Sequence, residues 1–313
     1  PVRGCPYRCN YCSVIKIAGH NVRSTSIDST IESLRRARDA GVEYIIFVSD
    51  NFNKYPDVTE LLEAIIDADL GLRFLCQCDT HVVNQPDLFE LLQKANCYEM
   101  FIGVESFSRT TLKTVHKYHN HPQKYQDLIK LCQDHGIRAH FSNIIGFPED
   151  TEDSILENLE ILKQLTPDVA SFYILTPIPG TEQYDDYMSR NLITESNLDH
   201  FDTTCSVWEH PTTSPQRLEE LLYHCYVDYY RHLMRKKDHH DQFPEFTVFC
   251  RYVAMQGIHP MAGGTGRVEL DKASDYIGMR QQFFDITYLP LPTSLRLSSE
   301  DEAFNSRISL VKK

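Results

Sequence analysis

Short apolar runs alternate with amphipathic stretches over the first half of the chain. Residues Tyr44–Val48 form a continuous apolar run, which is typical of a strand buried on both faces of a parallel sheet. Ahead of it, Ile27, Ile31 and Leu34 recur at helical spacing, and Gly41 follows as a stop signal. The pattern therefore predicts a surface helix that leads into a buried strand.

The alternation continues through four more strands. The expected strands are Leu72–Cys78, Tyr98–Val104, Ile137–Ile145 and Val169–Leu175, and the expected helices lie at 57–68, from Pro86, at 122–134 and around Ile155, Leu159 and Leu162. Strands that alternate with helices predict right-handed βαβ units and a parallel sheet. A sixth strand must precede Cys5, so we expect the sequence to begin partway through a longer protein. The pattern predicts an α/β fold, a partial (β/α)6 TIM-like barrel, with an open doubly wound sheet as the alternative.

The barrel pattern covers residues 1–185, and we interpret residues 186–313 as a mainly helical C-terminal extension that caps the substrate. An aromatic stripe runs along the expected helix Gln216–Arg235, and stripes of this kind usually serve packing. Beyond it, His239 and His240 indicate a solvated loop. The glycine-rich segment Met261–Arg267 indicates a loop near the barrel mouth, and residues 299–313 a polar tail.

Composition narrows the range of functions. The chain has 313 residues and a formal net charge of -13, which argues against the basic surface that nucleic-acid binding needs and favours a small-molecule or lipid substrate. Ten cysteines without a signal peptide indicate a reducing compartment. No apolar run approaches the roughly 20 residues that span a bilayer. We therefore expect a cytoplasmic protein without a transmembrane segment, associated with a membrane only if its substrate is a lipid.

Three of the cysteines, Cys5, Cys9 and Cys12, fall within eight positions. Thiols spaced C-x3-C-x2-C on a short loop can converge on one inorganic centre. A four-iron cluster held by three cysteines leaves one iron open, just as a catalytic zinc site leaves one position vacant. A structural zinc that also uses a histidine such as His20, or three buried free thiols, are the alternatives. Zinc sites usually present two close pairs of ligands, so the spacing favours an iron-sulfur site.

Polar residues follow several of the expected strands. Asp50 and Asn51 follow one strand, Glu105 and Ser106 follow another, and the cysteine loop follows the first. Ligands of parallel α/β folds gather at the carboxyl ends of strands. Each of these residues can also be a simple helix cap. Their recurrence on one rim together with the cysteine loop favours a binding site.

With Tyr11 directly before the last cysteine, the loop resembles the signature of the radical S-adenosylmethionine (radical SAM) enzymes. The resemblance implies the partial barrel and a [4Fe-4S] cluster held by Cys5, Cys9 and Cys12. It implies that the unique iron binds the amino and carboxylate groups of S-adenosylmethionine, which is then cleaved reductively to a 5'-deoxyadenosyl radical. It also implies a one-electron reductant of the flavodoxin or ferredoxin type.

The resemblance assigns further cofactor-binding positions but no catalytic residue. These positions are Tyr11, Asp50, Asn51, Glu105, Ser142, Ile144 and Gly146. Asp50 and Asn51 occupy the place of the family's Gly-Gly-Glu motif, which contacts the methionine amino group. Their residue types differ from that motif, but both side chains can accept a hydrogen bond. Glu105 and Ser142 match ribose-contacting positions, while Ile144 and Gly146 match the segment beside adenine.

Later segments are similar to one branch of this family. Residues 146–151, 175–181 and 201–211 resemble the branch that carries an N-terminal cobalamin-binding domain and includes hopanoid methylases. This implies cobalamin, bound by a domain outside this sequence, and methylation of a lipid or secondary metabolite. Two alternatives remain: a cobalamin-independent radical SAM rearrangement, cyclisation or tRNA modification, and a non-catalytic iron-sulfur electron-transfer module.

Overall fold

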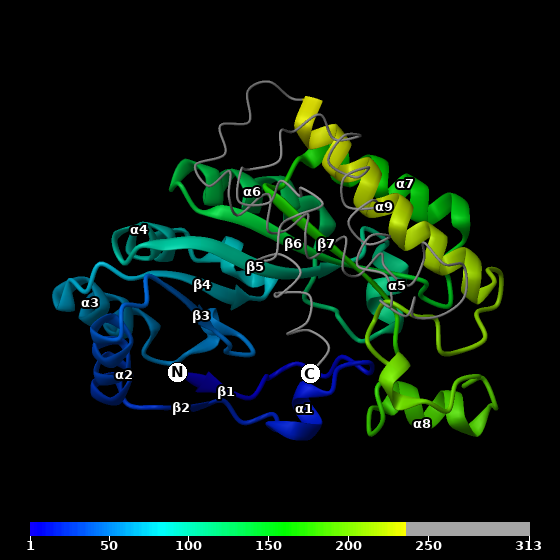
Figure 1. Ribbon diagram of the computed structural model, residues 1–313, viewed down its shortest axis with the longest axis horizontal. Coiled ribbons are helices and arrows are strands. Elements are labelled where there is room, and N and C mark those ends of the chain that lie inside the picture. The colour runs from blue at the N-terminus through cyan, green and yellow to red at the C-terminus, as the bar shows by residue number, and fades with distance from the viewer. Residues whose placement is uncertain (236–313) are drawn as a thin grey trace, which may run out of the picture.

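The computed structural model describes residues 1–235, and at its centre a parallel sheet curls into part of a barrel (Figure 1). The five strands lie in the sheet in their order along the chain, and each pairs in parallel with the next. They are β3 (Tyr44–Phe47), β4 (Arg73–Cys78), β5 (Cys97–Glu105), β6 (Arg138–Ile145) and β7 (Val169–Ile174). The predicted α/β partial barrel is confirmed.

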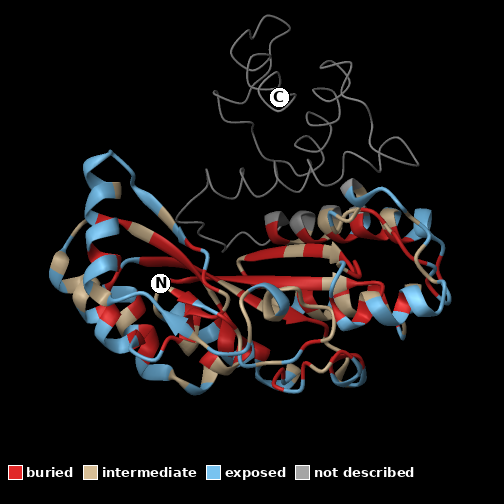
Figure 2. Ribbon diagram, turned by 90° about the horizontal axis from the view of Figure 1, so that it is seen from below, coloured by how far each residue is buried: buried red, intermediate tan, exposed pale blue. Residues whose placement is uncertain are grey.

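Helices connect successive strands and cover one face of the sheet. They are α2 (Ile27–Asp39), α3 (Val58–Ala68), α4 (Pro86–Lys94), α6 (Tyr125–Asp134) and α7 (Glu152–Leu165). Every second strand residue, such as Phe74, Met100 and Phe141, is buried in one apolar core with the inward faces of these helices. Figure 2 shows this pattern of burial: the strands are mainly buried (red), and the outer sides of the helices are exposed (pale blue). Burial of this apolar face is the main force that holds the helices on the sheet.

Helix starts follow local capping chemistry. The Ser26 side chain caps α2 by accepting from the N–H of Ser29. Thr151 and Ser154 form a reciprocal capping box at the start of α7. Pro86 occupies the first turn of α4, as its sequence position predicts. Three-residue and five-residue 3-10 helices fill other connections: η1 (Phe52–Lys54), η2 (Thr80–Asn84), η3 (Pro122–Lys124) and η4 (Leu198–His200).

Five short elements lie outside the predicted alternation. They are β1 (Val2–Arg3), α1 (Val14–Ile17), β2 (Arg23–Ser24), α5 (Arg109–Thr114) and α8 (Glu182–Ser189). β1 precedes Cys5, where a sixth barrel strand was expected, but it pairs with β2 in antiparallel fashion and is separate from the main sheet. Segments of two to eight residues carry too few positions for an apolar period to show in the sequence.

The predicted C-terminal helix is α9 (Pro215–Arg235), and its stripe serves packing. Leu221, Leu222 and Cys225 are buried in the same core as the barrel helices, because α9 lies against α7 and β7 (Figure 1). The packing interpretation of this helix is confirmed. The predictions for His239, His240, 261–267 and 299–313 fall outside the described residues, so the proposed cap of residues 186–313 stays a prediction.

One prediction about burial is wrong. Residues Tyr44, Ile46 and Val48 are 51%, 58% and 80% exposed, whereas a strand buried on both faces was expected. These alternate residues share one face of β3, the edge strand, and that face is left uncovered, whereas Phe47 on the other face is buried in the core under the helices. A continuous apolar run does not show whether a strand is central or at an edge.

Two further properties of residues 1–235 bear on the sequence analysis. Their nine cysteines are all free thiols. In this part of the chain, no helix combines the length and apolar character that crossing a bilayer requires.

Candidate functional site

The cysteine loop joins β1 to α1, and its backbone is tied down at both ends. The N–H of Cys5 donates to the Gly19 carbonyl at 3.2 Å, and the N–H of Cys12 donates to the Cys9 carbonyl at 3.2 Å. Gly4 has a φ of +95°, and a Cβ there would lie 2.4 Å from the Asn21 carbonyl oxygen. Only glycine fits this position, so the loop closes tightly onto the segment that follows it.

The three thiols share one environment. Burial raises the pKa of Cys9 to about 11, opposed by the nearby Lys117 ammonium, and burial also raises the pKa of Cys5 and Cys12. The Cys12 thiolate further raises the pKa of Cys5, and the Cys12 and Cys5 thiolates further raise that of Cys9, so the three lie close together. Metal binding would replace the thiol protons, as thiolate coordination requires.

The donor set of the loop consists of three thiols on one short segment. Within residues 1–235, no three His, Cys, Asp or Glu side chains are placed to hold one metal ion. A zinc ion needs all its ligands about 2.0–2.3 Å away, whereas a cubane takes each cysteine on a different iron. Three thiols on one short loop therefore match the donor set of a cubane with one iron left open.

The end of β3 supports the loop through side chains. The Ser49 hydroxyl accepts from the N–H of Val2 at 3.3 Å, and Asp50 Oδ2 accepts from the N–H of Gly4 at 2.7 Å. Asn51 Nδ2 donates to Cys5 Sγ at 3.0 Å. Asp50 and Asn51 are thus brought to the cysteine loop as predicted. Both already serve the loop itself, and their role toward a methionine amino group stays a prediction.

Glu105 sits in an unusual backbone conformation at the end of β5. Its φ is +61°, and the N–H of Ser106 donates to the Val104 carbonyl at 2.8 Å, which closes a tight turn around it. The pairing of β5 with β6 shifts register between Gly103 and Glu105, as at a β-bulge. Bulges and strained residues often aim a side chain at a functional site. Here they aim the Glu105 carboxylate at Gly103 and Lys117.

Lys117 links Glu105 to the cysteine loop. Its Nζ lies 2.8 Å from Glu105 Oε1 and donates to Tyr11 Oη at 3.4 Å. Burial lowers the pKa of Lys117, but the Glu105 carboxylate and the Cys9 thiolate raise it more, so the side chain stays charged. Ser142 Oγ donates to Glu105 Oε2 at 3.4 Å. One buried chain of polar contacts therefore joins β6, β5 and the cysteine loop.

The remaining predicted positions line the same region. The Tyr11 ring meets Phe147 edge to face at 6.3 Å between centroids, and Ile144 packs in the same small apolar cluster. Gly146 has a φ of +76°, and a Cβ there would lie 3.1 Å from the Leu218 side chain of α9. All seven predicted cofactor-binding residues thus lie around the cysteine loop and the ends of β3, β5 and β6. Their roles toward a cofactor stay predictions.

Sequence reasoning missed several polar residues near the site. Lys117 is buried, and the His119 ring stacks on Tyr7 of the cysteine loop at 3.5 Å between centroids. Burial, with help from Lys117, lowers the pKa of His119 to about 2, so this ring is neutral. Asn120 Nδ2 donates to the carbonyls of Gly103 and Val104 at 2.9 and 2.8 Å, which supports the bulge. These residues lie in the connection after α5, where the sequence has no hydrophobic periodicity that would have identified them.

The sheet face opposite the helices also carries a group of hydrogen-bonded polar side chains. His140 on β6 contacts Glu99 Oε1 through Nδ1 and Ser171 Oγ through Nε2, both at 2.7 Å. Ser171 pairs in register with Ser142, which contacts Glu105. Polar groups therefore continue from the candidate site along this face.

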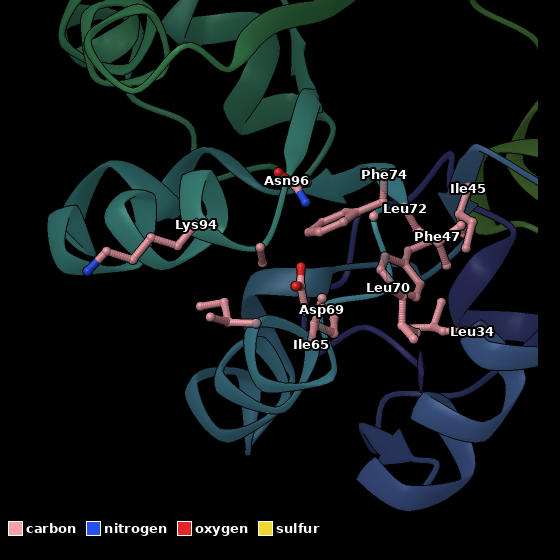
Figure 3. Close-up of a pocket in the computed structure, with 13 residues that line it drawn as sticks. Leu34, Ile45, Phe47, Ile65, Asp69, Leu70, Leu72, Phe74, Lys94 and Asn96 are labelled. Carbon is pink, nitrogen blue, oxygen red and sulfur yellow. The ribbon is translucent and has the colours of Figure 1, made fainter. Parts of the chain in front are cut away.

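An apolar pocket of about 40 Å³ lies elsewhere, beside the amino ends of β4 and β5 (Figure 3). Leu34 of α2, Ile65 of α3, and Phe47 and Phe74 of the sheet line it, and Figure 3 shows these side chains pointing toward one another. The cysteine loop and Glu105 lie at the opposite ends of the strands. This pocket is a packing gap between helices and sheet, separate from the candidate site.

Comparison with known sequences points to the same region of the chain. A sequence model of the radical SAM superfamily matches residues 1–162, about half of the chain. The bacteriochlorophyllide d C-12(1)-methyltransferase of Chlorobaculum tepidum is 28% identical over 222 residues, which are 70% of this chain and 48% of that protein. The hopanoid C-2 methylase of Rhodopseudomonas palustris is 24% identical over 233 residues, which are 70% of this chain and 44% of that protein. The chain spans about half the length of the curated relatives it matches.

A solved structure shares the fold. The radical S-adenosylmethionine methyltransferase TsrM of Kitasatospora setae, with cobalamin and a [4Fe-4S] cluster bound, superposes with a TM-score of 0.60 at 14% sequence identity. The alignment covers 92% of this chain and 61% of TsrM. At this identity the match shows a common fold and no more.

Proposed function

The chain belongs to the radical SAM superfamily, and on that premise we propose that Cys5, Cys9 and Cys12 hold a [4Fe-4S] cluster that acts on S-adenosylmethionine. The observation that carries the proposal is the buried contact chain from Tyr11 through Lys117 to Glu105. It makes the cysteine loop and the predicted ribose-binding carboxylate parts of one site. The predicted donor set also fits, because three cysteines leave one iron open.

The residues of the chain would hold and orient the cofactors. Held by Cys5, Cys9 and Cys12, a reduced cluster would supply the one electron needed to cleave S-adenosylmethionine into methionine and a 5'-deoxyadenosyl radical. Asn51 Nδ2 donates to Cys5 Sγ at 3.0 Å, and a hydrogen bond of this kind to a ligating sulfur tunes the reduction potential. Asp50 holds the backbone of Gly4, so it fixes the loop that carries the ligands.

Glu105 is suited to bind the two ribose hydroxyls. A carboxylate does the same work in dinucleotide sites, where it accepts hydrogen bonds from ribose. Lys117 pairs with one oxygen, Oε1, and Ser142 donates to the other at the longer distance of 3.4 Å. We propose that ribose hydroxyls bind at Oε2, that Ser142 supports them there, and that Tyr11, Ile144 and Gly146 border the adenine.

We further propose that the radical serves cobalamin-dependent methylation of a carbon centre in a lipid or secondary metabolite. The support is that curated relatives over 70% of this chain are methyltransferases, one of them a hopanoid C-2 methylase. A structural neighbour binds cobalamin together with a [4Fe-4S] cluster. Cobalamin would be held by a domain outside residues 1–313, in a cytoplasmic protein that receives its electron from a carrier.

Anaerobic reconstitution with iron and sulfide tests the first step. The cluster-loaded protein, reduced with dithionite and given S-adenosylmethionine, is expected to form 5'-deoxyadenosine and methionine in equal amounts. Cys9→Ala is expected to lose the cluster, measured by iron content, and to form neither product. A protein that carries four irons and four sulfides but leaves S-adenosylmethionine intact would be an electron-transfer module instead.

Cobalamin dependence is tested with the gene product in its full length. After incubation with hydroxocobalamin and gel filtration, retention of about one corrinoid per chain, read from visible absorbance, is the expected result. A protein that forms 5'-deoxyadenosine but retains no corrinoid would support the cobalamin-independent alternative.

A further inference from the structure

Charge is distributed unevenly along this acidic chain. Residues 1–27, which contain the cysteine loop, carry four Lys or Arg residues and no Asp or Glu. Residues 106–126 again carry four Lys or Arg and no acidic residue. Over the whole chain, acidic residues outnumber Lys and Arg by 44 to 31. These two segments, which are basic and free of acidic residues, meet at the proposed cluster.

Contacts join these two segments into one region. The N–H of Asn10 donates to the Val115 carbonyl at 3.3 Å, and Tyr7 stacks on His119. Arg23 Nη2 donates to the Ala18 carbonyl at 2.8 Å, which ties β2 to α1. In Figure 1 the dark blue elements β1, β2 and α1 lie together at one edge of the molecule.

The basic side chains of this region lack acidic partners. We call them the loop-side basic surface: Arg3, Arg8, Lys16, Arg23 and Lys113, all exposed. Among residues 1–235, none of the five forms a salt bridge. Exposed cations elsewhere commonly do, as Arg36, Arg38, Lys94, Lys130, Arg190 and Arg217 show. The cations near the cysteine loop are therefore available to a partner.

Two of these charges oppose each other. Arg3 and Arg23 stand directly across the antiparallel pair of β1 and β2. Like charges in this position destabilise a strand pair, and within residues 1–235 neither arginine forms a salt bridge that would offset the repulsion. An arrangement that costs stability in the isolated chain fits a surface that meets an anionic partner.

The proposed chemistry calls for such a partner, because each reductive cleavage consumes one electron. Cys5 and Cys12 are only half-buried, so the proposed cluster lies close to the loop-side basic surface. We propose that this surface is the docking site of an acidic one-electron carrier protein, and this inference rests on the proposed function. Complementary charge would raise the rate of encounter and orient the carrier toward the cysteine loop.

Charge reversal tests the docking site. The double variant Lys16→Glu with Lys113→Glu changes two cations that neither ligate metal nor contact Glu105. The matched control, Lys94→Glu with Lys130→Glu, makes the same change in net charge on α4 and α6. Each cluster-loaded protein is mixed at low salt with reduced flavodoxin, and cluster bleaching is followed by stopped-flow absorbance.

The proposal predicts that flavodoxin reduces the Lys16→Glu, Lys113→Glu variant more slowly than the control, by a factor of about ten or more. Salt should slow the wild type and narrow this difference, because screening shortens the reach of charge to about 10 Å at 0.1 M. Reduced methyl viologen, a small cation, should reduce the surface variant at least as fast as the control. Equal rates with flavodoxin for both variants would overturn the proposal.

Binding gives a readout that is independent of turnover. The affinity of the surface variant for oxidised flavodoxin, measured by calorimetry, should be lower than that of the wild type, whereas the affinity of the control should be unchanged. If the surface variant instead lost affinity for single-stranded RNA while flavodoxin binding held, the surface would serve nucleic acid and the proposal would be wrong. Failure of dithionite to support S-adenosylmethionine cleavage in the wild type would contradict the proposed function. The flavodoxin-binding measurements would still test the docking site on their own.

Discussion

Glu105 shows at the scale of one residue how the backbone serves the site. Its positive φ costs roughly 1–3 kcal/mol in a residue other than glycine. The bulge, the Ser106 turn and the amide of Asn120 hold it in place. The result is a carboxylate whose Oε1 binds Lys117, while Oε2 has only the long contact from Ser142. Strain is thus concentrated at the residue that we propose binds the ribose.

Gly103 makes room for this carboxylate. A Cβ at Gly103 would lie 2.7 Å from Glu105 Oε1 and 3.1 Å from Lys117 Nζ, so Gly103→Ala must displace the pair. Both atoms end flexible side chains, so stability should change by only about 1 kcal/mol. Affinity for S-adenosylmethionine, measured by calorimetry on the cluster-loaded protein, should fall about tenfold, which is about 1.4 kcal/mol.

Gly136→Ala is the matched control for this prediction. Gly136 has a φ of +65° and open space around it, so the substitution should cost about 1–2 kcal/mol of stability and leave the affinity unchanged. The account of Glu105 is wrong if Gly103→Ala binds S-adenosylmethionine as tightly as the wild type.

Asp150 gives a pH-dependent prediction. Burial raises its pKa to about 6 from an ordinary 3.8, against the opposing effect of the Phe147 and Gly146 N–H groups. Between about pH 4 and pH 6 the folded state therefore holds a proton that the unfolded state has lost. The stability that this proton confers falls as pH rises through that window, by about 2–3 kcal/mol.

Asp150→Asn should remove this dependence. An amide stays neutral and can still accept from the N–H of Phe147, as Asp150 Oδ2 does at 3.0 Å. Urea unfolding of the apoprotein from pH 4 to pH 7 should show the variant gaining about 2–3 kcal/mol relative to the wild type. Asp153→Asn, an exposed change in α7, should run parallel to the wild type. Parallel curves for Asp150→Asn would contradict the raised pKa.

The sequence revealed some site residues and hid others for physical reasons. Cys5, Cys9 and Cys12 were visible because metal chemistry fixes their spacing along one loop. Glu105 could be identified because it lies at the end of a predicted strand. Lys117 belongs to the same site only through the fold, since 12 positions separate it from Glu105 and no period marks it.

At the scale of elements, periodicity was informative wherever an element was long. The strands from 72 to 175 were predicted within one residue of their observed ends, α4 begins at Pro86 as predicted, and the helix expected at 122–134 begins three residues later, at Tyr125. The Tyr44–Val48 interpretation failed because the sequence does not show which neighbours a strand has. The short elements around the cysteine loop were missed, because hydrogen bonds to distant residues such as Ser49 and Asp50 hold that loop in place.

Helix α9 protects the far edge of the sheet, and Tyr226 makes the contact. Its hydroxyl accepts from the N–H of Phe172 at 3.1 Å and donates to the Phe172 carbonyl at 2.9 Å. Tyr226→Phe leaves both backbone groups of β7 without this partner and should destabilise the protein by about 1–3 kcal/mol.

Urea unfolding at neutral pH measures this cost. Tyr118→Phe, which removes a hydroxyl from a ring that is 58% exposed, should change stability by less than about 0.5 kcal/mol. Equal stability of the two variants would show that α9 holds the edge by apolar packing alone.

At the scale of the whole molecule, the sheet brings the ends of β3, β5 and β6 together beside the cysteine loop. The helices bury one face of the sheet, and the opposite face carries Glu99, His140, Ser142 and Ser171. Among residues 1–235, five exposed cations without a salt bridge lie near the cysteine loop, where we propose that an electron enters. Fold, polar residues and charge thus support the same assignment of one end of the barrel as the reactive end.

The central claim is that three cysteines hold a cubane whose fourth iron is open to S-adenosylmethionine. Electron paramagnetic resonance of the reduced, fully loaded protein, recorded with and without S-adenosylmethionine, tests it most directly. The account predicts that the spectrum of the reduced cluster changes when S-adenosylmethionine is added. An identical spectrum in the presence of excess S-adenosylmethionine, from protein that contains four irons per chain, would contradict it.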